Sequence, residues 1–131
     1  MSRTVLIIED SDTCSETLRI ALEQIPEVAI QAASTARGAL KILAGGDCVV
    51  SAVVADLQLP GMSGLDLLAR VRSDPRFAAL PFFIISGDSD PGLPGRALAG
   101  GADAFFPKPY SPAEVRRRLE QLLTCRPQPF G

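Results

Sequence analysis

The stretch A-V-V-A-D-L-Q-L-P-G-M-S-G, residues 52–64, decides the fold. Mostly apolar residues run from position 49 to position 55 and end on one carboxylate, Asp56, before Pro60 and Gly61 turn the chain. An apolar run of this length, bounded by turn residues, is typical of a strand buried on both faces, as in a parallel sheet. We therefore expect Asp56 at the edge of the sheet where open α/β folds bind their ligands.

Further strands and helices alternate on both sides of this stretch. Apolar and β-branched composition predicts strands over residues 4–8, 28–33, 49–55, 81–85 and 104–106. Helix-start signals follow at Ser11, Asp12 or Thr13, at Ser34 or Thr35, at Ser63 and at Ser111. The Pro- and Gly-rich residues 90–95 disfavour a long helix after the fourth strand, so a short one from Pro94 to about residue 99 is expected. Such alternation predicts an α/β fold, a parallel sheet with helices on both faces.

Length and composition limit the classes of protein. The 131 residues suffice for one domain, which we expect over residues 1–125, with residues 126–131 as a flexible tail or linker stub. A net charge of −2 offers no basic footprint for direct nucleic-acid binding. The sequence shows neither a membrane-length apolar run nor a signal peptide, so a cytoplasmic location is the default expectation.

Cysteine and histidine usage narrows the chemistry. Three cysteines without a C-x-x-C pair argue against a disulfide framework and against a zinc site. The chain contains no histidine, which removes histidine-based acid–base catalysis and most catalytic triads.

Polar residues fall at the ends of four predicted strands. Glu9 and Asp10 follow the first strand, Asp56 the third, Ser86 the fourth and Lys108 the fifth. Because the carboxyl ends of parallel strands share one edge of a sheet, these side chains are expected to meet there. Three carboxylates in one crevice repel each other and need a cation, and a set of oxygen ligands favours Mg²⁺. A metal ion and a lysine beside an aspartate describe a site for a phosphoryl group.

Together these segments resemble the receiver domain of two-component response regulators. The resemblance rests on the acidic pair at 9–10, on D-L-Q-L-P-G-M-S-G from Asp56, on I-I-S-G at 84–87 and on P-K-P-Y at 107–110. It covers roughly residues 4–124 and implies a flavodoxin-like (βα)5 doubly wound parallel sheet of five strands in the order 2-1-3-4-5. The fourth helix of that fold would be shortened or irregular here.

The resemblance also implies a role for each site residue. Asp56 is the expected phosphoacceptor, with Lys108 and Ser86 contacting the phosphoryl oxygens. The expected metal ligands are the side chains of Asp10 and Asp56 and the backbone carbonyl of Gln58, with Glu9 in the outer sphere. The resemblance further implies that Ser86 and Phe105 change position on phosphorylation as a switch. It implies that Gln58 and Asp88 tune the lifetime of the phosphoryl group. The peptide bond between Lys108 and Pro109 is expected to be cis.

Phosphorylation of Asp56 in the presence of Mg²⁺, by a histidine kinase or a histidine phosphotransfer protein, is therefore the expected function. It would switch a surface read by a downstream protein or a fused output domain, and a homodimer stays open as an arrangement. The chain would not be an enzyme beyond its own phosphorylation and slow dephosphorylation. The unusual residues 90–95 put in question the output face that the family builds around its fourth helix.

Other interpretations stay open beside this one. A receiver-like interaction module that is never phosphorylated is one, and a phosphatase of the haloacid-dehalogenase type with Asp56 as nucleophile is another. Those phosphatases carry a second aspartate two residues after the nucleophile, where this chain has Gln58. Phe105 could be an ordinary core residue, since an aromatic side chain in a strand needs no further role.

Overall fold

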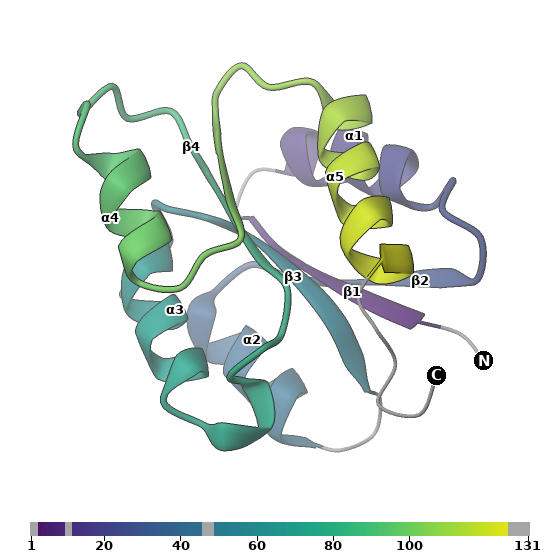
Figure 1. Ribbon diagram of the computed structural model, residues 1–131, viewed down its shortest axis with the longest axis horizontal. Coiled ribbons are helices and arrows are strands. Elements are labelled where there is room, and N and C mark those ends of the chain that lie inside the picture. The colour runs from purple at the N-terminus through teal and green to yellow at the C-terminus, as the bar shows by residue number, and fades with distance from the viewer. Residues whose placement is uncertain (1–2, 10–11, 46–48, 126–131) are drawn as a thin grey trace.

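The computed structural model of the chain has five parallel strands in the order β2-β1-β3-β4-β5, with helices on both faces of the sheet (Figure 1). The structure describes residues 3–9, 12–45 and 49–125. The strands are β1 (Arg3–Ile8), β2 (Val28–Ala33), β3 (Val50–Asp56), β4 (Phe82–Ser86) and β5 (Ala104–Pro107). The helices are α1 (Asp12–Leu22), α2 (Ala36–Gly45), α3 (Gly64–Arg72), the short 3-10 helix η1 (Pro75–Phe77), α4 (Leu93–Ala99) and α5 (Pro112–Cys125).

This architecture confirms the fold expected from the sequence, including the strand order. Strand bounds differ by one residue at several ends. β3 begins at Val50, because Val49 is 82% exposed, and it includes Asp56 as its last residue. β4 likewise includes Ser86 as its last residue. The predicted tail at 126–131 lies outside the described residues.

The sheet separates two hydrophobic cores. Successive β1 residues alternate between them, as side chains in a strand must: Leu6 and Ile8 face α2, α3 and α4, whereas Val5 and Ile7 face α1 and α5. Figure 1 shows these two groups of helices on opposite faces of the sheet. β3 lies beside β1 with five consecutive buried residues from Ala52 to Asp56, so its apolar run is covered on both faces.

Side-chain caps start α2, α3 and α5 where the sequence predicted them, whereas α1 begins at Asp12, so Thr13 lies within that helix rather than before it. The hydroxyl of Ser63 accepts a hydrogen bond from the Asp66 N–H at 3.1 Å and begins α3. Thr35 accepts one from the Gly38 N–H at 3.0 Å before α2, and Ser111 accepts one from the Glu114 N–H at 3.3 Å before α5. Each cap satisfies a backbone donor that the helix itself leaves free.

The inward face of α3 differs from the prediction. The spacing of apolar residues after Ser63 predicts Leu65, Leu68 and Val71 on the inward face, but Leu65 is only partly buried and Leu67 is fully buried in its place. The buried positions of α3 are 64, 67, 68 and 71, a regular helical stripe that begins at Gly64, where the helix contacts the end of β3.

The short α4 confirms the expectation of a reduced fourth helix. It spans seven residues from Leu93 to Ala99, so it starts one residue before Pro94, the residue expected at its first position. Leu93 and Ala97 are buried against the core and attach the helix to the sheet. No helix in the described part of the chain combines the length and apolar character that crossing a bilayer requires.

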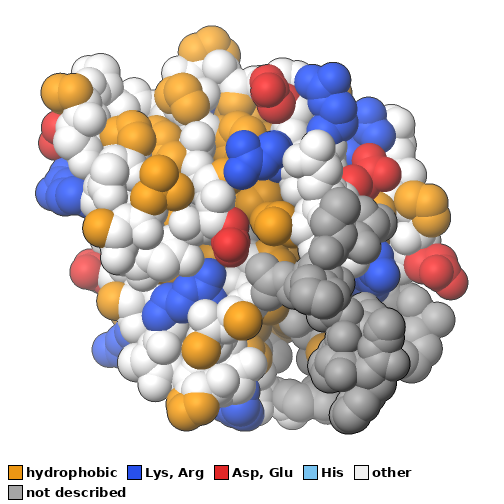
Figure 2. All heavy atoms as spheres, viewed as in Figure 1, with side chains coloured by type: hydrophobic (Ala, Val, Ile, Leu, Met, Phe, Trp, Pro, Cys, Tyr) orange, Lys and Arg blue, Asp and Glu red, His pale blue; other side chains and the backbone are white. Residues whose placement is uncertain are grey.

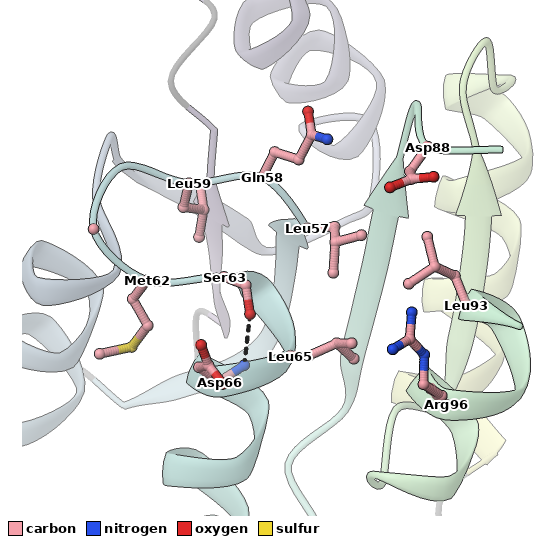
Figure 3. Close-up of a pocket in the computed structure, with 11 residues that line it drawn as sticks. Leu57, Gln58, Leu59, Met62, Ser63, Leu65, Asp66, Asp88, Leu93 and Arg96 are labelled. Atoms are coloured by element: carbon pink, nitrogen blue, oxygen red, sulfur yellow. Dashed lines mark hydrogen bonds between the residues drawn. The ribbon is translucent and has the colours of Figure 1, made fainter. Parts of the chain in front are cut away.

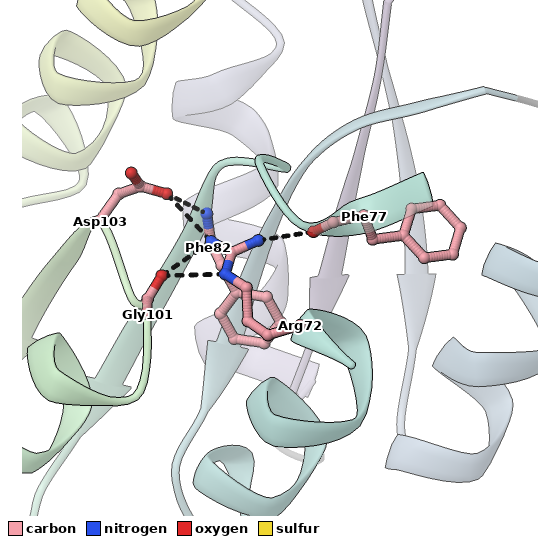
Figure 4. Close-up of polar contacts among 5 residues, drawn as sticks. All are labelled: Arg72, Phe77, Phe82, Gly101 and Asp103. Carbon is pink, nitrogen blue, oxygen red and sulfur yellow. Dashed lines mark hydrogen bonds and ion pairs between the residues drawn. The ribbon is translucent and has the colours of Figure 1, made fainter. Parts of the chain in front are cut away.

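A polar cluster that the sequence did not reveal joins the end of α3 to η1, to the start of β4 and to the segment before β5 (Figure 4). The guanidinium of Arg72, at the end of α3, donates to the Gly101 carbonyl from Nε at 3.1 Å and from Nη2 at 2.8 Å. It also donates to the Phe77 carbonyl at 2.8 Å and contacts Asp103 Oδ2 at 3.4 Å. Asp103 Oδ2 in turn accepts the Phe82 N–H at 2.9 Å. We call these five residues the Arg72 brace.

Candidate functional site

Four polar side chains lie where the sheet strands end. Glu9 directly follows β1, Asp56 ends β3, Ser86 ends β4 and Lys108 directly follows β5. Glu9, Asp56 and Ser86 are buried, at 5%, 4% and 0% exposure. Burial of ionised and hydroxyl groups is unusual unless they have polar partners. The edge of the sheet that the sequence predicted as the site therefore gathers polar and charged side chains, three of which are buried.

Lys108 brings the two described carboxylates together. Its Nζ donates to Asp56 Oδ2 at 2.7 Å and to Glu9 Oε2 at 3.3 Å. The three groups come from three different strand ends, separated by as many as 99 residues in sequence. This convergence was predicted from the order of the strands and the residues that follow them.

The electrostatics of Lys108 follow from this contact. Burial alone would lower the pKa of its ammonium group, but the hydrogen bond and charge of Asp56, together with the charge of Glu9, outweigh burial and raise that pKa above its usual value. Lys108 is therefore fully charged at neutral pH. Two carboxylates share this one ammonium, so Glu9, Asp56 and Lys108 together carry a net charge of −1.

The backbone after β3 fixes the other side of Asp56. The Gln58 N–H donates to Asp56 Oδ1 at 3.0 Å, so the carboxylate is held from both oxygens. The Gln58 side chain itself is exposed. Leu57 continues the β3–β4 ladder by donating from its N–H to the Ile85 carbonyl at 2.8 Å.

Gly64 is a site residue that the sequence analysis did not identify. A Cβ atom at this position would lie 2.5 Å from the Asp56 carbonyl oxygen and 3.0 Å from the Leu57 Cα. Its N–H donates to the Leu57 carbonyl at 2.7 Å. Only glycine therefore lets the start of α3 pack directly against the end of β3. The signal was the second glycine of the P-G-M-S-G turn, whose role depends on a contact that sequence alone does not show.

Ser86 and Lys108 are tied together through the backbone. The Lys108 N–H donates to the Ser86 carbonyl at 2.7 Å, which continues the β4–β5 pairing beyond Pro107. The Ser86 hydroxyl accepts the Asp88 N–H at 3.0 Å. The peptide bond between Lys108 and Pro109 is cis, as the resemblance implied.

Two grooves flank the loop between β4 and α4. The first, of about 530 Å³, has an apolar floor between α3 and α4, and Figure 3 shows Leu57, Leu65 and Leu93 there, with Arg96 extending from α4 toward the same space. The second, of about 300 Å³, lies between this loop and β5 and includes Phe105. Asp88 lines both grooves.

Phe105 and Asp88 therefore lie beside the cluster of charges rather than within it. Phe105 is half-buried and packs against the core that faces α2, α3 and α4. Asp88 is exposed. In the described structure, its one hydrogen bond to a site residue is from its backbone N–H to the Ser86 hydroxyl. Asp88 is hydrogen-bonded to Ser86, and Phe105 pairs with Ile84, two residues before Ser86 on β4.

The predicted metal ligand Asp10 lies outside the described residues. Among the side chains that the structure describes, no group of three from His, Cys, Asp or Glu is placed to hold a metal ion. The described donors are oxygen atoms from Glu9 and Asp56, which suit a hard divalent cation. Their excess negative charge, which a cation would neutralise, also fits the expected Mg²⁺.

The surface around the site carries charges of both signs. Figure 2 shows basic and acidic side chains interspersed on the face that it displays, and hydrophobic side chains between α4 and α5. This distribution does not form the basic stripe that nucleic-acid binding requires on that face.

Comparisons with known proteins agree with this geometry. The family model described as the response regulator receiver domain matches residues 5–120. The chain is 29% identical to the chemotaxis protein CheY1 of Helicobacter pylori over 91% of this chain and 95% of that protein. It is 28% identical to the phosphate regulon transcriptional regulatory protein PhoB of Pseudomonas aeruginosa, over 94% of this chain but only 52% of that protein. The solved signal receiver domain of a DNA-binding response regulator from Colwellia psychrerythraea is 27% identical, with a TM-score of 0.84 over 93% of this chain and 98% of that one.

Proposed function

Because the chain belongs to the response regulator receiver domains of two-component systems, we propose that Asp56 is the residue that accepts the phosphoryl group. Receiver domains are signalling modules, and phosphorylation and Mg²⁺ are general to them. The observation that carries the assignment is the 2.7 Å contact between Lys108 Nζ and Asp56 Oδ2 at the end of β3. It supplies a buried carboxylate nucleophile with a fixed positive charge beside it.

The transfer step follows from the groups at the site. An oxygen of Asp56 attacks phosphorus, a P–O bond forms, and the P–N bond of a phosphohistidine donor breaks, with the electron pair leaving on the imidazole nitrogen. The donor is a histidine kinase or a histidine phosphotransfer protein, since this chain has no histidine of its own.

Lys108 and Ser86 stabilise the transferred group. The ammonium of Lys108, which now contacts Asp56, pairs with a phosphoryl oxygen once the carboxylate has become an acyl phosphate. The hydroxyl of Ser86 donates a hydrogen bond to another of these oxygens. Fixed donors aimed at developing negative charge are the main way in which proteins accelerate such transfers.

The divalent cation, Mg²⁺, would be held by the side chains of Asp10 and Asp56 and by the backbone carbonyl of Gln58, with Glu9 in the outer sphere. When bound, the ion neutralises charge on the phosphoryl oxygens. The described part of this donor set, two buried carboxylates against one ammonium, supports the assignment.

Phosphorylation then changes the surface that a partner reads. When Ser86 donates to the phosphoryl group, the loop after β4 shifts and Phe105 repacks beside it. The groove between this loop and β5 contains both Phe105 and Asp88, so its shape depends on the change. A downstream protein or a fused output domain reads the altered surface.

The decisive experiment is covalent labelling of the intact chain. We expect a small acyl phosphate donor with Mg²⁺ to add one phosphoryl group, detected by intact mass, and Asp56→Asn to abolish the addition. Asp66→Asn is the matched control, because Asp66 is an exposed aspartate on the nearby α3 and should label normally. Labelling that persists in Asp56→Asn would overturn the assignment. No labelling of the wild type, together with no beryllofluoride binding, would favour an unphosphorylated interaction module, and turnover of a phosphoester would favour a phosphatase.

A further inference from the structure

The loop between β4 and α4 contains a series of side-chain hydrogen bonds that starts at Ser86. Ser86 Oγ accepts the Asp88 N–H at 3.0 Å, Asp88 Oδ1 accepts the Asp90 N–H at 2.9 Å, and Asp90 Oδ1 accepts the Gly92 N–H at 2.9 Å. Each bond joins a side chain to the backbone two residues later. We call these three bonds the Ser86 ladder.

Short polar side chains at alternate positions make this arrangement. The sequence S-G-D-S-D-P-G, residues 86–92, places an acceptor at 86, 88 and 90 and a free backbone donor two residues after each. Asp and Ser side chains readily close such turns on their own backbone. The ladder therefore arises from the same Pro- and Gly-rich segment that shortens α4.

The far end of the ladder is anchored on α4. Asp90 Oδ2 forms an ion pair with Arg96 Nη2 at 3.2 Å, while Asp90 Oδ1 holds the Gly92 N–H. One carboxylate thus connects the loop to the helix. Arg96 is four residues into α4, which is itself fixed to the core by Leu93 and Ala97.

The near end of the ladder determines how Ser86 is oriented. Ser86 is completely buried, so its hydroxyl has few ways to turn without losing a partner. Accepting the Asp88 N–H leaves the hydroxyl hydrogen free to donate elsewhere. A donor is what the proposed phosphoryl contact needs.

From this geometry we infer that Asp90 and Arg96 are positioning residues for Ser86: they hold the Asp88 N–H on the hydroxyl and so keep Ser86 ready to donate to the phosphoryl group. The inference rests on the proposed function for its consequence in phosphorylation. The ordering of Ser86 itself is independent of that function.

Kinetic coupling provides the main test. Asp90→Ala should lower the rate of Mg²⁺-dependent phosphorylation by a small acyl phosphate about threefold, the value of one neutral hydrogen bond. In a Ser86→Ala background the same substitution should have no further effect, because the hydroxyl that it positions is absent. Asp90→Asn keeps an acceptor for the Gly92 N–H but loses the charge for Arg96, so its effect should fall between wild type and Asp90→Ala.

Asp74 supplies a matched control within the same chain. Asp74 Oδ1 accepts the Arg76 N–H at 2.9 Å and Oδ2 pairs with Arg76 Nη2 at 2.8 Å, at the start of η1. Asp74→Ala thus removes the same kind of cap and ion pair without touching the Ser86 ladder. It should leave the phosphorylation rate unchanged in both backgrounds.

A measurement without phosphorylation separates the two proposals. The Hα–Hβ coupling constants of Ser86 should indicate one χ1 rotamer in the wild type and in Asp74→Ala, and averaged rotamers in Asp90→Ala and Arg96→Ala. Unchanged couplings, or an equal loss of rate with and without the Ser86 hydroxyl, would overturn the positioning role. Ordered couplings in a chain that is never labelled would instead leave the ladder intact and remove the proposed function.

Discussion

The two edges of the sheet each contain a partly buried polar cluster, and the clusters differ in how well their charges balance. At the amino-terminal edge of β4, Arg72 pairs with Asp103 and donates to the carbonyls of Gly101 and Phe77. At the carboxyl-terminal edge, Lys108 serves both Asp56 and Glu9. The Arg72 brace carries no net charge, whereas the Lys108 cluster carries one excess negative charge.

We expect this difference to separate a structural cluster from the proposed phosphorylation site. In the brace, the hydrogen bonds of the guanidinium to Gly101 and Phe77 join α3 to the turn before β5 and to η1. In the Lys108 cluster, two carboxylates share one ammonium, and their mutual repulsion favours binding of a cation or reaction at a carboxylate. Three substitutions or conditions test this contrast.

The largest effect is expected at the brace. Arg72→Ala removes hydrogen bonds to two carbonyls and leaves Asp103 partly buried without its cation, so unfolding free energy should fall by about 3 kcal/mol. Urea denaturation measures the change. Arg70→Ala, in the exposed part of the same helix, is the control and should change stability little. At temperatures where Arg72→Ala stays folded, its phosphorylation rate should match wild type; a large loss of rate would remove the distinction between the two clusters.

Replacing an aspartate by asparagine should change the free energy of unfolding in opposite directions at the two edges of the sheet. Asp56→Asn, measured without divalent cations, should raise the unfolding free energy by about 1 kcal/mol, because one of two carboxylates that share an ammonium is neutralised. Asp103→Asn should lower it by about 1 kcal/mol, because a balanced pair loses a charge. Thermal denaturation of both variants measures these changes. If both variants gain stability, or both lose it, the excess negative charge of the Lys108 cluster does not affect stability.

The smallest effect is expected in alkaline solution. The pKa of Lys108 in the folded chain lies above its usual value of 10.5, so Lys108 stabilises the fold at any pH below that value and loses this contribution as pH rises through the higher folded value. Stability should therefore fall more steeply above about pH 10.5 in wild type than in Lys108→Met. Urea midpoints across this range test it. Equal slopes would mean that the Asp56 and Glu9 contacts do not raise the pKa.

Much of this molecule follows from the order of short sequence signals. The apolar run before Asp56 predicted a buried strand, and acidic, hydroxyl and ammonium residues after four strands predicted one shared site. Glu9, Asp56 and Lys108 meet there because parallel strands place their carboxyl ends together, a consequence of topology that needs no knowledge of side-chain packing. The role of Asp10 in metal binding stays a prediction.

Contacts between distant segments were beyond the sequence. Arg72 looks like any surface arginine at the end of a helix, and only the folded chain places the Gly101 carbonyl within its reach. The burial of Leu67 instead of Leu65 depends on how α3 sits on the sheet, which Gly64 fixes through its approach to β3. Such features depend on the relative placement of elements, whereas periodicity reports only on one element at a time.

Asp88 lines the grooves on both sides of the β4–α4 loop. If phosphorylation of Asp56 changes the loop as proposed, a molecule that binds either groove must change the phosphorylation equilibrium by the same factor with which phosphorylation changes its own affinity. Thermodynamic reciprocity thus makes the loop a two-way connection: an occupant of a groove would act on the phosphorylated fraction of the protein as well as respond to it.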